Sequence, residues 1–164
     1  MAMSLKLSNL AATVTNVKSN TDKNEEGEKD VRTHIDFKAE IDAELMDQLS
    51  LGDPFSFKDV FFTKEGDVKN VGIKTMDIDR KYDDHRLTIQ HDRLSGPEEL
   101  VLDADIHQLK LTPMHGHRFM LGFRAATNPG INNMAFIAES QIIDCIVFVE
   151  PVQLDLEDSE GEEG

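Results

Sequence analysis

Three histidines in the second half of the chain have spacings that suit a metal site. His115 and His117 are two residues apart and would share one face of an extended strand, while His107 precedes them on the same stretch. Imidazole nitrogens are common zinc ligands, which makes this group a candidate. The alternative is that the pair flanks a turn glycine, Gly116, and faces solvent. Because no convincing fourth ligand accompanies them, we expect neither a metal nor a cofactor.

Two pairs of closely spaced carboxylates are candidates for Mg²⁺ binding or acid–base catalysis. The pairs are Asp77 with Asp79 and Asp83 with Asp84, and the basic residues among them are Arg80, Lys81 and Arg86. Such mixed charge is also typical of a polar loop that water solvates. The sequence contains no glycine-rich phosphate loop, nucleophile elbow or paired cysteine motif. We therefore expect no catalytic residues and a protein that is not an enzyme.

The segment HRFMLGFR, residues 117–124, alternates strictly between two kinds of side chain. One face would carry three large apolar residues, which predicts that it belongs to the core. The other face would carry cations and Gly122, and a glycine within a strand permits close approach of a ligand. With a lysine from the preceding strand, this face could follow a single-stranded nucleic-acid backbone, or it could simply be solvated. The candidate nucleic-acid-binding residues are Lys110, Arg118, Arg124 and His117.

The sequence ends in LDLEDSEGEEG, residues 154–164, which has no basic side chain. Such a segment cannot bury enough apolar surface to offset the chain entropy lost on folding, so we expect a disordered tail. Its carboxylates could occupy the cationic strip of the same chain or dock on basic patches of partner proteins. The candidate partner-binding residues are Asp155, Glu157, Asp158, Glu160, Glu162 and Glu163.

Charge is distributed unevenly along the chain, whose formal net charge is −15. The tail contributes −6, which leaves −9 for residues 1–153. Affinity for duplex nucleic acid comes from an excess of Lys and Arg, so an acidic body argues against a general duplex-binding surface. Residues 106–138 contain no carboxylate, however, and they include the cations named above. The sequence thus predicts one locally basic region on an acidic protein.

The single cysteine, Cys145, lies in the apolar run IIDCIVFVE and is expected to be buried and unreactive. Its isolation fits a reducing compartment. No stretch approaches the ~20 apolar residues of a membrane span, and MAMSLKLSNL at the N-terminus has too short an apolar region for a secretory signal. We expect a cytoplasmic protein with no membrane partner.

Apolar and polar residues alternate in several segments, which predicts a mainly β fold. The clearest strand is 31–41, which follows a first strand in 4–18 and a polar loop, 19–30, that we expect to be mobile. Residues 42–52 change to helical spacing, with a capping aspartate at the start and a glycine beyond the end. The later strands are expected as two in 55–78 around the turn KEGD, one in 85–92, a long hairpin in 100–125 and a last one in 142–149.

These elements predict one domain over residues 1–153, followed by the tail 154–164. Seven to nine short antiparallel strands favour a β-sandwich or a small, partly open barrel, for which an OB-like form is one option. One short helix accompanies the strands. No internal repeat and no linker to a second domain is evident.

A β-rich domain followed by an acidic tail resembles phage and bacterial single-stranded DNA-binding proteins. The resemblance implies binding of single-stranded DNA and docking of the tail on partner proteins. The tails of that class commonly finish in an aromatic residue, whereas this one finishes in EGEEG. The front segments KLSNLAATVTNVK and HIDFKAEIDAELMDQL also look like small proteins encoded by tailed phages, which would place the chain in a bacterial host cytoplasm.

Two functions from different classes follow. The first is a non-enzymatic accessory of phage DNA replication or recombination that binds single-stranded DNA through the cationic strip. The second is an acidic inhibitor that imitates nucleic acid and occupies the basic groove of a host defence complex, of anti-restriction or anti-CRISPR type. The expected partner is therefore single-stranded DNA or a basic protein groove, and a homodimer is left open. We favour the first, because tail and β domain occur together in that class.

Overall fold

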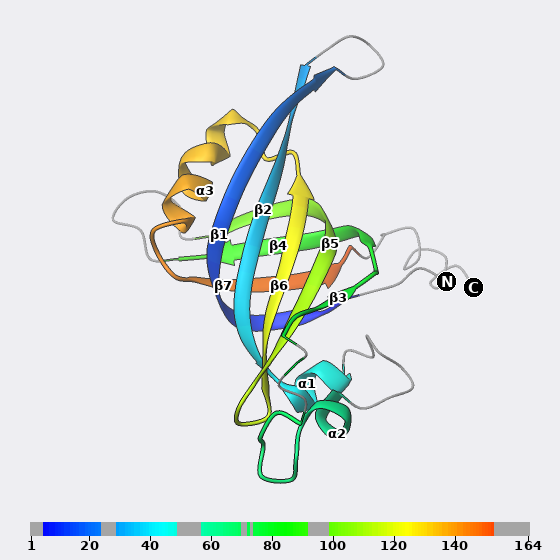
Figure 1. Cartoon of the computed structure of the whole chain (residues 1–164). Coiled ribbons are helices and arrows are strands. Elements are labelled where there is room, and N and C mark those ends of the chain that lie inside the picture. The colour runs from blue at the N-terminus through cyan, green and yellow to red at the C-terminus, as the bar shows by residue number, and fades with distance from the viewer. Residues whose placement is uncertain are drawn as a thin grey trace, which may run out of the picture.

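The chain folds as one antiparallel β-sheet that closes on itself, as a computed structural model shows (Figure 1). The structure describes residues 5–23, 29–48, 57–69, 72, 74–91 and 99–152. Within these ranges the strand order is β3-β5-β4-β7-β1-β2-β6, and β5 also pairs with β6. The strands are β1 (Leu7–Lys23), β2 (Lys29–Asp42), β3 (Met76–Ile78), β4 (Tyr82–Gln90), β5 (Glu99–Met114), β6 (Arg118–Thr127) and β7 (Cys145–Pro151).

The pairing of β5 with β6 closes a ring from which only the short strand β3 is left out. Along one edge of β5, residues 99–106 pair with β4 and residues 109–111 pair with β3. The other edge of β5 pairs with β6. Strand β5 therefore has a neighbour on at least one edge along nearly all of its length, and on both edges in its middle part.

Alternation along the strands separates the core from the outer face of the barrel. In β2 the residues Ile35, Phe37, Ala39 and Ile41 are buried, and in β6 the residues Phe119, Leu121 and Phe123 are buried. The residues between them point outward, because successive side chains of a strand face opposite sides. The alternation predicted for residues 31–41 and 117–124 is confirmed over residues 33–41 and 118–124, and Cys145 is buried as expected.

Short helices lie at two separate places around the barrel (Figure 1). They are α1 (Ala43–Gln48), α2 (Phe57–Phe61), the 3₁₀ turn η1 (Ile131–Asn133) and α3 (Met134–Ser140). Helices α1 and α2 lie beside the turn between β5 and β6, where the backbone N–H of Ala43 donates to the carbonyl of His117 at 2.9 Å. Helix α3 contacts β1 and stacks Phe136 against His91, with ring centroids 4.0 Å apart.

The mainly β fold, the small barrel and the helix predicted in 42–52 are confirmed. The predicted loop 19–30 is too long, because β1 continues to Lys23 and β2 already begins at Lys29. Polar side chains support this extension by bonding across the ribbon, as Ser19 does with Thr33 at 3.0 Å. Residues 24–28 of that loop lie outside the described residues, and so does the whole predicted tail 154–164 with its candidate partner-binding carboxylates.

Two other segments differ from the prediction. Residues 55–78 were expected to hold two strands, but they contain α2, one isolated bridge between Phe62 and Val68, and the three residues of β3. Packing decides the outcome, since Phe61 and Phe62 both place their rings edge-on against Phe119 of the core. Helix α3 was not predicted, although its buried residues Phe136, Ile137 and Ser140 follow helical spacing.

Candidate functional site

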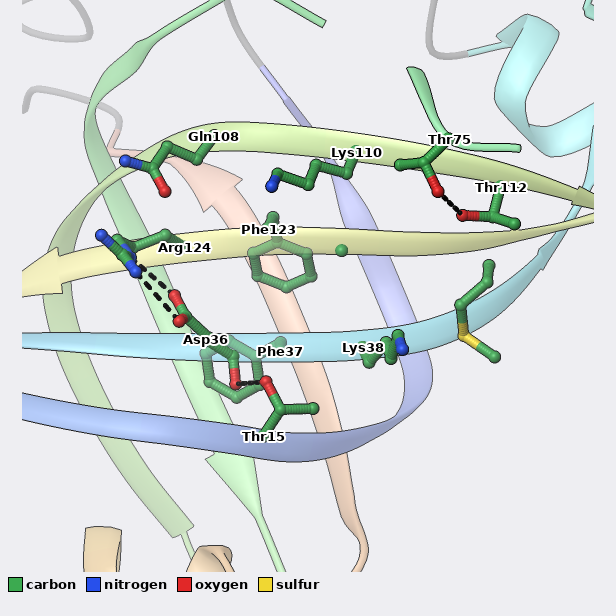
Figure 2. A pocket seen from close by; sticks show the side chains of 12 residues that line it. Thr15, Asp36, Phe37, Lys38, Thr75, Gln108, Lys110, Thr112, Phe123 and Arg124 are labelled. Atoms are coloured by element: carbon green, nitrogen blue, oxygen red, sulfur yellow. Dashed lines mark hydrogen bonds and ion pairs between the residues drawn. The ribbon is translucent and has the colours of Figure 1, made fainter. Parts of the chain in front are cut away.

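A groove of about 540 Å³ crosses the outer face of β2, β6 and β5 (Figure 2). Strand register sets its centre, because Gly122 of β6 is paired with Lys38 of β2 on one side and with Lys110 of β5 on the other. Gly122 has no side chain, so it forms the floor between the two lysines. The three residues come from separate parts of the sequence, and closure of the sheet brings them into one row.

The space above Gly122 is open. A Cβ atom added at this position would lie 3.8 Å from the Phe37 carbonyl oxygen and 3.9 Å from Cβ of Lys110, which are ordinary contact distances. A ligand can therefore approach the backbone of β6 closely, as glycine within a strand allows. A larger side chain would fill the groove without displacing the backbone.

The two lysines place positive charge on both sides of Gly122. Both side chains are exposed, and within the described part of the chain neither one forms an ion pair. The nearest acid to Lys110 by register is Asp77 of β3, and its carboxylate is also exposed. Exposed ammonium groups on flexible stems are free to turn toward an anion in the groove.

Arg124 lies at one end of the groove and already has a partner. Its Nε and Nη2 atoms donate to the two carboxylate oxygens of Asp36 at 2.6 and 3.0 Å (Figure 2). These hydrogen bonds lower the pKa of the Asp36 carboxyl, and they raise the pKa of the Arg124 guanidinium. A fork-to-fork pair of this kind fixes the guanidinium in one orientation and neutralises its charge.

Two of the four predicted nucleic-acid-binding residues lie elsewhere. Arg118 donates to Glu40 at 2.7 Å near the turn between β5 and β6, and it does not line the groove. His117 adopts a positive φ of 56° in that turn. Its Nε2 atom lies 3.0 Å from the Thr63 carbonyl oxygen, and its ring packs on Phe62. The structure thus brings Lys110 and Arg124 together and places His117 in a packing role.

Lys38 was not predicted as a site residue. The sequence placed it on the outer face of the strand 31–41, but it gave no indication of which strand would be the neighbour. Pairing with β6 puts Lys38 beside Gly122. The only local signal was an outward-facing cation in the predicted strand 31–41.

Two half-buried histidines lie beside Arg124. His34 of β2 and His107 of β5 meet edge to face, with ring centroids 6.2 Å apart, and His107 is the register partner of Arg124. Burial lowers the pKa of both imidazoles, and the positive charge of Arg124 lowers both further. The Nδ1 atom of His34 is buried and has no hydrogen-bond partner.

The residues considered for metal binding do not converge. Among the residues that the structure describes, no group of three or more His, Cys, Asp or Glu side chains is placed to hold a metal ion. His115 is exposed and lies 3.5 Å from a carboxylate oxygen of Asp67, whereas His107 faces His34. The acid pairs are also dispersed, since Asp83 lies 3.5 Å from Lys81 and the backbone N–H of Asp84 donates to Asp105.

Comparisons with known proteins identify no relative of this chain. No protein-family model matches it, and neither a curated protein nor a solved structure is significantly similar to it. Within the described residues, no helix has the length and apolar character needed to cross a lipid bilayer. Function must therefore be argued from the groove itself.

The lowered pKa values of His34 and His107 predict a pH-dependent stability. Below about pH 6.5 the unfolded chain protonates these residues before the folded chain does, so the free energy of unfolding should fall as the pH decreases through this window. Urea unfolding between about pH 7.5 and pH 5.5 measures how steeply the free energy of unfolding changes with pH. This slope should be smaller in a His34→Gln, His107→Gln double variant. An equal slope in the wild type and the variant would show that the two imidazoles do not contribute.

Proposed function

We propose that the protein is a non-enzymatic binder of single-stranded nucleic acid and that the groove over Gly122 holds the sugar–phosphate backbone. The observation that carries the proposal is the row Lys38, Gly122, Lys110, in which two ammonium groups that form no ion pair with another described residue flank an open floor. Neighbouring strands are about 4.8 Å apart, so the two lysines are anchored about 10 Å from each other across β6. Lysines with this spacing can contact phosphates on either side of a strand that lies in the groove.

The surface composition defines the mode of binding. Among the described residues the large exposed apolar side chains are Leu45, Val60, Val101 and Ile142, and none of them is aromatic. Stacking of bases on rings, which commonly strengthens single-strand binding, has no exposed platform there. Contacts to phosphate would then supply most of the affinity. Binding should be moderate, insensitive to base sequence and strongly dependent on salt.

Removal of both lysine charges tests the groove directly. A Lys38→Gln, Lys110→Gln variant should bind a labelled oligothymidylate at least about tenfold more weakly at low salt. Each lost phosphate contact reduces the slope of log affinity against log salt by about 0.7, so the slope should fall by about 1.4. Fluorescence anisotropy over a series of salt concentrations measures both quantities.

The matched control is a Lys6→Gln, Lys64→Gln variant, which changes the net charge equally at exposed positions outside the groove. It should keep nearly all of the affinity. Equal weakening of the two variants would mean that the charge of the whole protein governs binding and that the groove is not the site.

Substitution of the groove floor gives an independent test. Gly122 does not have a positive φ, and the space above it accepts a Cβ, so Gly122→Thr should fit the strand and leave the melting temperature unchanged or higher. The threonine side chain should nevertheless occupy the position of the ligand and weaken oligothymidylate binding by about tenfold. Unchanged affinity in a folded variant would remove the groove from the proposal.

The second candidate function is the acidic inhibitor, and specific contacts favour it. Two of the predicted cations, Arg118 and Arg124, are neutralised by Glu40 and Asp36. Outside the groove, β4 and the first part of β5 expose Asp83, Asp84 and Asp103. A surface of this kind suits a basic protein groove better than a polyanion.

Truncation of the acidic tail separates the two functions. A chain that stops after Gln153 loses six carboxylates that compete with nucleic acid for the groove, so the binder should gain affinity for oligothymidylate, most clearly at low salt. Anisotropy titrations of the full-length and truncated forms provide the measurement. Absence of binding in both forms at low salt would reject the first function and favour the inhibitor.

A further inference from the structure

We infer that His34, His107 and Arg124 form a phosphate subsite at one end of the groove, which binds its ligand more tightly when the imidazoles are protonated. The inference rests on the proposed function and specifies how that same site would be regulated. Its basis is a cluster drawn from β2, β5 and β6, in which two half-buried imidazoles lie beside one paired guanidinium.

The groups around the two imidazoles are unevenly charged. Four cations and two carboxylates act on them, and each carboxylate is already bound to an arginine: Asp36 to Arg124 and Asp105 to Arg32 at 3.2 Å. The full set consists of Lys18 of β1, Arg32 and Asp36 of β2, Arg124 of β6, Asp105 of β5 and Lys81 before β4. Protonation therefore adds positive charge where the available acids are already engaged.

An anionic ligand relieves this excess charge. A protonated His34 needs an acceptor for its buried Nδ1, which has no partner in the structure. Asp36 can supply this acceptor by turning toward the imidazolium, which releases Arg124 to bind a phosphate of the ligand. Ligand binding and proton uptake then favour each other, and linkage requires that the coupling be reciprocal.

A pH titration of binding tests this coupling. Oligothymidylate is the probe because thymine does not titrate in the range used, and ionic strength is held constant. The full-length wild type should bind at least about fivefold more tightly at about pH 5.5 than at about pH 7.5. A His34→Gln, His107→Gln variant should change by less than about twofold, while the control His115→Gln, at an exposed site, should behave as the wild type does.

The outcomes test the inference separately from the proposed function on which it rests. Wild-type binding that is independent of pH, or equal pH dependence in the wild type and the double variant, overturns the inference and leaves the groove as a binding site. No binding at any pH overturns both. Binding that tightens in the wild type and not in the double variant supports both.

Reciprocity gives a second measurement that needs no substitution. Imidazole resonances of the isotopically labelled chain, titrated with and without oligothymidylate, report the pKa of each histidine. The ligand should raise the pKa of His34 and His107 and leave His115 unchanged. If the pKa values of His34 and His107 are the same with and without bound ligand, the inference is overturned, whatever the variants show.

Asp36 provides the last arm of the experiment. Asp36→Asn releases Arg124 at neutral pH, so this variant should bind oligothymidylate at about pH 7.5 several-fold more tightly than the wild type does. The matched control is Glu40→Gln, which removes the same charge but releases Arg118, a residue outside the groove. Equal gains in the two variants would show a general charge effect and count against the subsite.

Discussion

The β-bulge at Gln108 is the constraint on which the groove depends. The register between β5 and β6 shifts between His107 and Lys110, and Gln108 adopts a positive φ of 54°. His107 and Gln108 consequently both face outward, Leu109 is buried, and Lys110 faces outward again. If the strand alternated regularly through Gln108, the period of two would turn Lys110 into the core and Leu109 into solvent. The bulge thus determines which side chains of β5 can reach Gly122.

The row of residues at Gly122 depends on the register of three strands, because no single strand contains all of them. The β2–β6 pairing brings Lys38 to one side of Gly122, and the β5–β6 pairing brings Lys110 to the other. Because ring closure fixes both registers together, the groove is a property of the closed barrel. A slip in either pairing would expose apolar residues as well as disperse the site, so the core protects the arrangement.

Strands could be predicted from the sequence, with the side chains that they bury, where the structure follows local periodicity. The strand 31–41 and the alternation in 117–124 could be predicted because the apolar residues of each must face one core. The ion-pair partners of the arginines could not be predicted in the same way. Arg118 meets Glu40 and Arg124 meets Asp36, which are separated by 78 and 88 positions in the sequence. Lys38 became part of the candidate site only when its neighbouring strand was known. Helix α2 was missed because the contacts of Phe61, at its end, and of Phe62, directly after it, with Phe119 outweigh the local pattern.

An acidic protein can keep a site for an anion because local charge outweighs net charge at short range. At physiological ionic strength the screening length is about 8 Å, so carboxylates of the described residues that lie farther than this from the groove oppose a ligand there only weakly. Three of the nearby acids are bound to arginine, Asp36 to Arg124, Glu40 to Arg118 and Asp105 to Arg32, whereas Asp77, the register partner of Lys110, is exposed. Arginine suits this task, since its planar fork matches a carboxylate. The arginines thereby neutralise the neighbouring carboxylates, and the flexible lysines stay available for a ligand. Although both predicted arginines are bound to carboxylates, Lys38 and Lys110 still give the groove positive charge.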